Sequence, residues 1–206
     1  MKNLKEALHE IISEYISDKS TVLDLGCGNG VLLKHLVDTK EVICHGIEIK
    51  TDAIISAIEK GISVIQWDLN KLPLDFPDNA FDFVTMQQAI QEIKEPKKLI
   101  LEMLRIGKEV IMSFPNFGNI NIRGKFFFTG QMPITDELPN KWYDTPNIHL
   151  LTVKDFEGFC DDYGIRIIRK IFLKRDRMTK KYKRIKALSN MRADVAVYKI
   201  RLKSKG

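Results

Sequence analysis

The stretch VLDLGCGNG, residues 22–30, constrains the fold of this 206-residue chain more than any other. It begins as an apolar strand and ends where a helical pattern starts, so it is typical of a turn between a strand and a helix. Gly26, Gly28 and Gly30 allow positive φ and let a ligand approach the backbone closely. The N–H groups at the start of the helix face the same space. The loop therefore predicts a ligand site at the end of a strand.

The spacing of the glycines argues against a phosphate ligand. A dinucleotide-binding fingerprint, GxGxxG, needs its third glycine at position 31, where Val31 stands. The loop also lacks the Lys-Ser/Thr pair of loops that bind nucleoside triphosphates. An adenosine-bearing ligand without phosphates fits this loop better.

Strands and helices alternate around the loop. After a first helix at about 3–17, we expect strands at 21–25, 41–48, 62–67, 81–86 and 108–114. We expect helices between them at about 29–38, 52–60 and 95–106. Short apolar strands separated by helices are typical of a parallel sheet covered on both faces.

The C-terminal part has a different pattern. A helix at about 152–163 precedes two β-rich runs, 165–173 and 193–202, with no helical pattern between them. These two runs predict an antiparallel hairpin. We therefore expect one α/β domain over residues 1–206, with a mostly parallel seven-stranded sheet and an irregular insertion at about 115–151.

Carboxylates stand at the ends of the first three expected strands: Asp24, Glu48 and Asp68. In an open α/β sheet, ligands lie outside the C-terminal strand ends, and a carboxylate there can accept both ribose hydroxyls. Glu48 is placed for a ribose, and Asp68 for an adenine amino group with Trp67 or Leu69 beside the ring. Each acid alone is as readily a solvated strand-end residue, so the prediction depends on their combination with the glycine loop.

This combination resembles the class I S-adenosylmethionine (SAM) dependent methyltransferases, whose glycine motif is similar to LDLGCGNG. The resemblance implies a Rossmann-like fold that binds SAM or S-adenosylhomocysteine, with the glycine loop on the methionine part. It also implies that the residue after the fourth strand lines the methyl side. The cofactor-binding residues expected from this resemblance are Asp24, Gly26, Cys27, Gly28, Gly30, Glu48, Asp68, Leu69 and Gln87.

The acceptor side carries no evident catalytic set. The sequence QQAIQEI after the fourth strand is not the Asn/Asp-Pro-Pro-aromatic motif of base-modifying methyltransferases, and no Cys stands near it. Glu92, Asp144 and His149 are the candidates for a general base, yet each is explained more simply by a surface or structural role. We assign no catalytic residue. Methyl transfer can proceed by positioning, so activity stays open.

Residues 115–151 are too long and too aromatic for an ordinary loop. Loops beyond ~12–15 residues are uncommon unless they are functional or disordered, and the aromatic content argues against disorder. The aromatic residues of this segment are Phe117, Phe126, Phe127, Phe128, Trp142 and Tyr143. They can bury against the domain, line a substrate pocket, or cover a protein interface.

The segments FPDNAFDFV, SFPNFGN, WYDTPNIHL and LSNMRADVAVY together resemble the MetW family, the methionine-biosynthesis W proteins. The resemblance runs over nearly the whole chain, although MQQAIQE departs from the family's SQTLQ while keeping Gln87. It implies a role in bacterial methionine biosynthesis and a hetero-oligomer with homoserine O-acetyltransferase. The residues expected to face that partner or a substrate are Asn116, Trp142, Tyr143, Asp144, Asn147 and His149.

The charge, the cysteines and the hydropathy argue against a nucleic-acid-binding protein, a metal-binding protein and a membrane-spanning protein. Residues 174–186 hold eight Lys or Arg against one Asp, which leaves about −1 of the net charge of +6 for the rest of the chain. This block favours a solvated or partner-facing loop over a nucleic-acid groove. The scattered Cys27, Cys44 and Cys160 favour a reducing cytoplasm and, with scattered histidines, no metal site. No apolar run approaches the ~20 residues of a membrane span.

Two functions follow. The leading hypothesis is a protein with a SAM pocket that binds and supports homoserine O-acetyltransferase. The chain cannot be that acyltransferase, because it lacks a GxSxG nucleophile elbow. The alternative is an active methyltransferase on a small-molecule acceptor.

Overall fold

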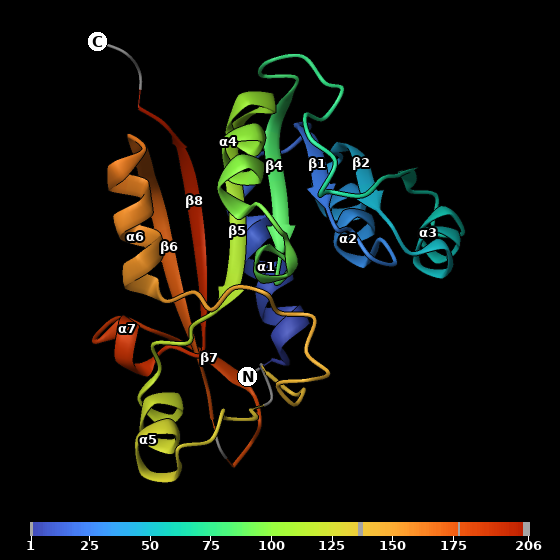
Figure 1. Cartoon of the computed structure of the whole chain (residues 1–206). Helices are drawn as coiled ribbons and strands as arrows, with labels where there is room; N and C mark the ends of the chain where they lie inside the picture. Colours follow the sequence, from blue (N-terminus) through green and yellow to red (C-terminus); the bar gives the residue numbers. More distant parts are fainter. Residues whose placement is uncertain (1, 136–137, 177, 204–206) are drawn as a thin grey trace.

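The computed structural model describes residues 2–135, 138–176 and 178–203. These residues contain one eight-stranded sheet in the order β3-β2-β1-β4-β5-β8-β6-β7 (Figure 1). The strands are β1 (Thr21–Leu25), β2 (Ile43–Glu48), β3 (Ser63–Gln66), β4 (Phe81–Gln87), β5 (Gly107–Pro115), β6 (Ile165–Arg175), β7 (Tyr182–Ile185) and β8 (Val195–Leu202). The first five run parallel, whereas β8 is antiparallel to β5 and to β6, and β7 is antiparallel to β6.

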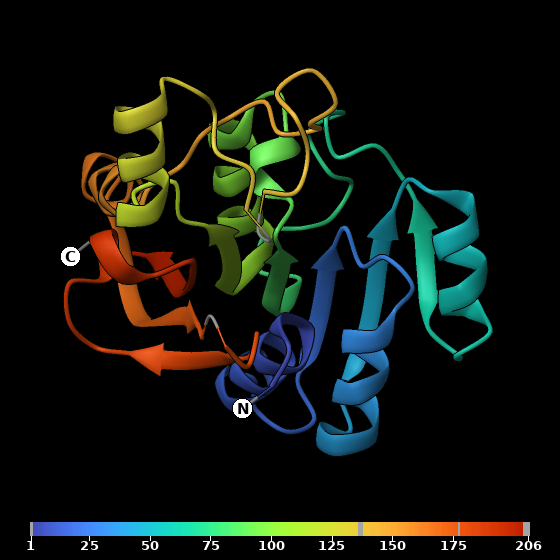
Figure 2. The same cartoon turned by 90° about the horizontal axis from the view of Figure 1, so that it is seen from below.

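Helices cover both faces of the sheet, as the alternation of the sequence predicts (Figure 2). Apolar residues of α1 and α2 form one core with the sheet, and those of α4 and α6 form the other. The helices are α1 (Leu4–Tyr15), α2 (Val31–Lys40), α3 (Thr51–Ile58), η1 (a 3₁₀ turn, Ile90–Glu92), α4 (Pro96–Ile106), α5 (Ile120–Thr129), α6 (Val153–Asp162) and α7 (Ser189–Arg192).

The expected Rossmann-like, mostly parallel sheet with an antiparallel C-terminal part is confirmed, but the count of seven strands is wrong. The eighth strand is β7, which lies in the basic segment 174–186 that we expected to be a loop. Tyr182 is buried there while Lys183 and Arg184 are exposed. A strand in this segment buries its apolar side chains and leaves its charges in water.

Residues 115–151 are less irregular than expected. The segment contains α5, whose N-cap Asn119 accepts a hydrogen bond from the N–H of Asn121 at 2.8 Å. It then crosses the molecule and reaches α6, where Thr152 and Asp155 form a capping box. The insertion therefore joins the end of β5 to the start of α6 at the lower end of the molecule (Figure 1).

Candidate functional site

The glycine loop folds back onto the end of β2. The N–H groups of Gly26 and Cys27 both donate to the carbonyl of Ile47, at 2.8 and 3.0 Å. Gly28 adopts a φ of 54°, a conformation that favours glycine. Gly30 is required by packing as well, because a Cβ there would lie 2.9 Å from the Cβ of Ala57 in α3. The backbone of the loop is thus fixed between β1 and β2.

Glu48 holds this loop from the end of β2. One oxygen of its carboxylate accepts a hydrogen bond from the N–H of Gly28 at 2.9 Å. The other accepts from the N–H groups of Ile49 and Lys50, at 2.8 and 2.9 Å. The side chain is buried, and three backbone donors offset the cost of taking its charge out of water. The carboxylate is therefore positioned before any ligand arrives.

Asp24 lies deeper, at the end of β1. Its side chain is 1% exposed, and its Oδ1 accepts a hydrogen bond from the hydroxyl of Thr85 at 2.6 Å. Burial raises the pKa of Asp24 to about 7; the Thr85 hydrogen bond opposes this shift and the negative charge of Glu48 adds to it. Asp24 thus titrates close to neutral pH.

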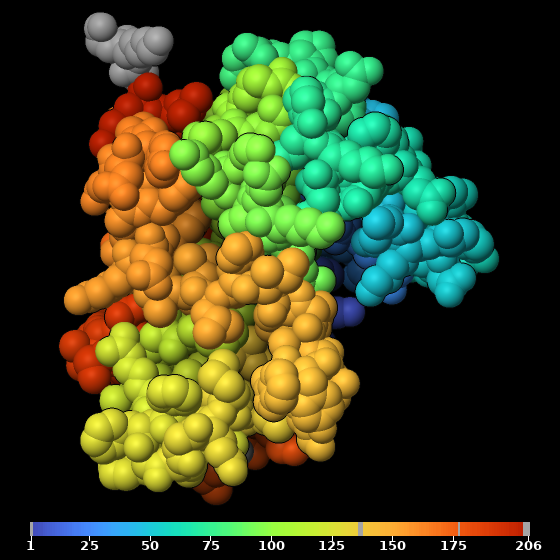
Figure 3. Space-filling model, viewed as in Figure 1, coloured from blue at the N-terminus to red at the C-terminus, as the bar shows by residue number. Residues whose placement is uncertain are grey.

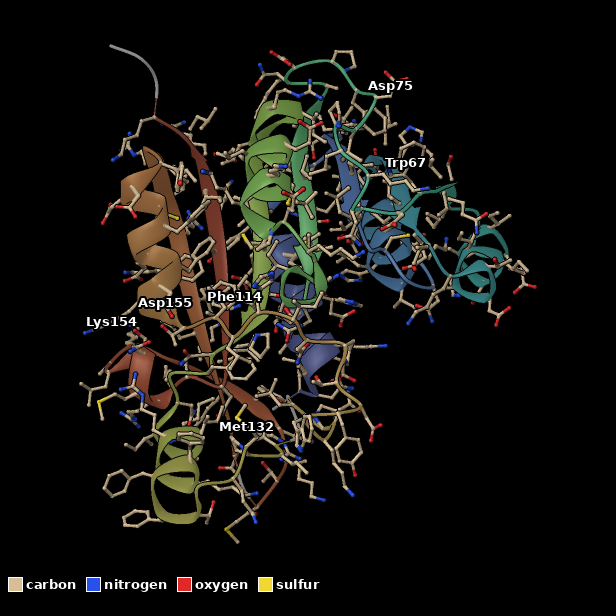
Figure 4. All side chains as sticks on the ribbon, viewed as in Figure 1. Trp67, Asp75, Phe114, Met132, Lys154 and Asp155 are labelled. Carbon is tan, nitrogen blue, oxygen red and sulfur yellow. The ribbon has the colours of Figure 1, made fainter. Side chains whose placement is uncertain are left out.

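A cleft of about 430 Å³ opens beside these residues. Asp68 lies in its wall, and its Oδ1 accepts from the N–H and the side-chain amide of Asn70, both at 2.9 Å. These hydrogen bonds hold the pKa of Asp68 below its ordinary value. Trp67 lies on the loop that leaves β3 (Figure 4), and 42% of this residue is exposed to solvent. The cleft is lined by Gly26, Gly28, Glu48, Ile49, Lys50, Ala53, Trp67, Asp68, Leu69, Asn70, Ala89, Glu92 and Ile93.

The structure brings five of the nine expected cofactor residues to this cleft: Gly26, Gly28, Glu48, Asp68 and Leu69. The other four have different surroundings. Asp24 lies in the core, and Gly30 packs against α3.

Cys27 packs against β2, where a Cβ at Gly46 would lie 2.4 Å from its sulfur. Gln87 ends β4 opposite Ser113. Neither residue lines the cleft.

The wall formed by Ala89, Glu92 and Ile93 was missed by the sequence analysis, apart from Glu92 as a possible base. These residues belong to the turn after β4, and η1 occupies its middle. Ala89 is a small residue opposite the glycine loop, since a Cβ on Gly26 would lie 3.7 Å from the Cβ of Ala89. Proximity to the end of a parallel strand was the available signal.

The η1 turn also anchors the segment 146–151. The carbonyl of Gln91 accepts hydrogen bonds from the N–H groups of Ile148 and His149, at 2.8 and 3.1 Å. The ring Nε2 of His149 lies 3.3 Å from the carbonyl oxygen of Lys94. One short turn therefore forms a wall of the cleft and fixes the segment that carries His149.

His149 faces a second hollow rather than the cleft. This hollow measures about 260 Å³ and lies between α4, α6 and the anchored segment. Its walls are mainly apolar, with Ile90, Ile100, Phe156 and Phe159 among them. His149 is therefore a structural and pocket-lining residue in this arrangement.

The other residues of the expected partner face divide into two groups. Trp142 and Tyr143 are 75% and 58% exposed, and Asp144 beside them is also exposed. Asn147 is half-buried, and its N–H donates to the Thr145 hydroxyl at 3.2 Å. The aromatic pair thus projects into solvent.

Asn116 does not belong to that face, because it is 1% exposed. Its amide donates to the carbonyls of Asn190 and Ala193, at 3.0 and 2.9 Å. Its side-chain oxygen accepts from the N–H groups of Gly118 and Val153, at 3.0 and 3.2 Å. Asn116 ties the end of β5 to α6 and α7, so its role is structural.

Metal-ligand clusters and membrane-spanning helices are both absent from the described residues. No cluster of three or more His, Cys, Asp or Glu side chains there is arranged to hold a metal ion. No helix in the same part of the chain has the length and apolar character needed to cross a membrane.

Comparison with known sequences identifies a family. The model of the family described as "Methionine biosynthesis protein MetW" matches residues 6–200. The bifunctional methionine biosynthesis protein MetXA/MetW of Rhodopirellula baltica is 34% identical over 172 residues. That match covers 79% of this chain but only 28% of the longer relative. The chain thus corresponds to one part of that protein.

Solved structures agree on the fold. A SAM-dependent methyltransferase of Thermotoga maritima superposes with a TM-score of 0.68 at 14% identity, over 95% of this chain and 87% of that one. A SAM-dependent methyltransferase of Mesorhizobium loti also gives 0.68, at 15% identity over 93% and 96% of the two chains. At these identities the likeness shows the fold alone.

Proposed function

The chain belongs to the MetW family, and on that premise we propose that it is a SAM-pocket protein of methionine biosynthesis that associates with homoserine O-acetyltransferase and supports its activity. The observation that supports this partner is the Rhodopirellula baltica relative, whose name joins MetXA and MetW in one polypeptide. Fusion places two modules at a high effective concentration, an arrangement suited to proteins that act together. The same association is proposed for this chain.

The cleft supports the cofactor. Its volume of about 430 Å³ lies within the usual range of roughly 300–1,000 Å³ for ligand sites. Glu48 offers a pre-positioned carboxylate to the ribose hydroxyls, and Asp68 offers one to the adenine amino group beside Leu69. Gly26 and Gly28 present bare backbone to the remainder of the ligand. When bound, SAM would supply an activated methyl group and a positive charge.

Asp24 supports the same assignment from within the core. A carboxyl group that titrates near pH 7 ionises readily when a cation comes close. SAM carries such a cation, and S-adenosylhomocysteine lacks the sulfonium charge. Asp24 is therefore proposed to act on the ligand through its charge from within the core rather than as a lining residue.

The test of this function measures acetyl transfer from acetyl-CoA to homoserine by the purified acyltransferase of the same organism. We expect activity to rise when this protein is added and the two proteins to co-elute on gel filtration. Unchanged activity together with separate elution would refute the proposal. Repeating the assay with SAM, and with S-adenosylhomocysteine, tests whether ligand in the cleft regulates the pair.

The second candidate is an active methyltransferase on a small-molecule acceptor. The cleft favours it, because Glu48, Asp68 and the glycine loop are all present around one cavity. Incubation with SAM and a small-molecule cell extract should then produce S-adenosylhomocysteine above the background without protein. No turnover by protein that binds SAM would count against this candidate and would leave the first one intact.

A further inference from the structure

One end of the molecule exposes a group of large apolar side chains. Phe127 and Phe128 on α5 are each 82% exposed, and the rest of the group is roughly half exposed or more. Figure 3 shows α5 and the segment after it at the same lower end of the molecule. Met132, which belongs to that segment, also lies there (Figure 4). We call this surface the aromatic end, formed by Phe126, Phe127, Phe128, Met132, Ile134, Trp142 and Tyr143.

The helix that carries this surface buries none of its own side chains: all ten residues of α5 are described, and none is buried. Helices of this length are marginal in isolation and normally gain their stability by packing an apolar face. Exposed apolar patches of this kind mark interaction sites, so α5 has the properties of a helix that another molecule covers.

We propose that the aromatic end is the surface on which the acyltransferase partner docks, and that the partner receives it in an apolar recess bordered by acidic side chains. The inference rests on the proposed function. Aromatic side chains dominate the binding energy of protein interfaces because they fill such recesses. The acidic border is required by the charges beside the aromatic end.

Those charges come from the basic segment 174–186, which holds eight Lys or Arg against one Asp. A hollow of about 230 Å³ brings the two regions together, since Ile122 of α5, Leu138, Lys174 and Arg175 all line it. Two copies of this chain meeting through the aromatic end would set these like charges against each other. A partner with acidic residues around its recess would not.

The arrangement of the phenylalanines favours a protein recess over a membrane surface. Consecutive helical residues are about 100° apart, so Phe126–Phe128 spread over about 200° of the helix circumference. A helix that lies on a lipid surface gathers its apolar side chains on one face. Side chains that point to both flanks require a partner that wraps around the helix.

The test uses the full chain and the acyltransferase of the same organism, with binding measured by calorimetry. Phe127→Ser with Phe128→Ser should weaken binding about 30-fold or more, as should Trp142→Ser with Tyr143→Ser. The matched control is Ile43→Ser with Ile58→Ser, because these residues are also 65% and 56% exposed but lie in β2 and α3. The control should bind like the wild type, and all variants should keep the wild-type Tm and SAM affinity.

The charged border has its own variant. Lys174→Glu with Lys183→Glu, at paired positions of β6 and β7 in the basic segment, should slow association about tenfold or more at low salt, with a smaller effect at high salt. An unchanged association rate would overturn the acidic border of the recess.

The remaining outcomes separate this inference from the proposed function. Wild-type binding that neither aromatic variant weakens would overturn the docking surface and leave the proposed function standing. A wild type that does not bind the acyltransferase would remove both. The Phe127 and Phe128 variant could instead keep partner binding unchanged and lose self-association, anionic vesicle binding or oligonucleotide binding. That result would assign the surface to the corresponding other occupant.

Discussion

Asp24 makes the chain less stable as the pH rises, and Asp24→Asn should remove that part of the pH dependence. Burial raises the pKa of this carboxyl group from 3.8 to about 7. Between these values the folded chain holds a proton that the unfolded chain has released. The stability contributed by this proton is fully present below about pH 4 and is lost as the pH rises through 7.

The size of the effect follows from the same two values. A tenfold change in proton concentration is worth about 1.4 kcal/mol per bound proton. The interval from 3.8 to about 7 therefore corresponds to at most about 4 kcal/mol of unfolding free energy. This is a large share of the ~5–15 kcal/mol that stabilises a typical domain.

The assay is urea denaturation of the wild type and of Asp24→Asn between pH 4 and pH 8. Other groups titrate in this range, including His9, whose pKa burial lowers, but they contribute equally to both proteins. The wild-type free energy minus the variant free energy should fall by about 2–4 kcal/mol as the pH rises. Thr85→Val removes a hydrogen bond that lowers the pKa of Asp24, so it should move this fall to higher pH. Parallel curves for wild type and Asp24→Asn would refute the reasoning.

Three further predictions concern the cleft and the insertion. Glu48→Gln places amide hydrogens against backbone N–H groups, so SAM affinity measured by calorimetry should fall about tenfold. Glu59→Gln on the surface should leave the SAM affinity unchanged. Equal SAM affinities of Glu48→Gln and the wild type would contradict the pocket. Asn116→Ala leaves buried backbone groups unpaired, so urea denaturation should show a loss of about 2–4 kcal/mol, and an unchanged stability would contradict the structural role. Because η1 lines the cleft and anchors residues 148–149, saturating SAM should change the affinity for the acyltransferase about fivefold or more. Equal affinities with and without SAM would show that η1 does not couple the cleft to the partner surface.

The parallel half of the fold could be predicted because its signals are local. Each strand there is a short apolar run, and the glycine loop fixes where the first strand ends. Glu48 is the last residue of β2 and Asp68 lies two residues after β3, so strand order alone brings them to one edge of the sheet. The same reasoning could not give the depth of Asp24, since burial depends on what Thr85 and the rest of β4 place around it.

The later half depends on contacts that the sequence does not display. β7 has four residues, and it becomes recognisable only by its pairing with β6. The sequence of α5, INIRGKFFFT, contains a central Gly and no apolar stripe, so periodicity does not indicate a helix. Asn116 was expected on the partner or substrate face from the MetW resemblance; its burial follows from four hydrogen bonds to segments up to 77 residues away.

The position of β8 has a consequence for how this protein folds during its synthesis on the ribosome. β8 is the last described strand along the chain, yet it lies between β5 and β6 in the sheet. The five parallel strands can assemble while synthesis continues, but β6 and β7 have no edge to join until β8 has emerged. During that interval β5 carries an open edge, a known template for pairing with other chains. A newly made molecule is therefore most prone to aggregate in the interval before β8 emerges.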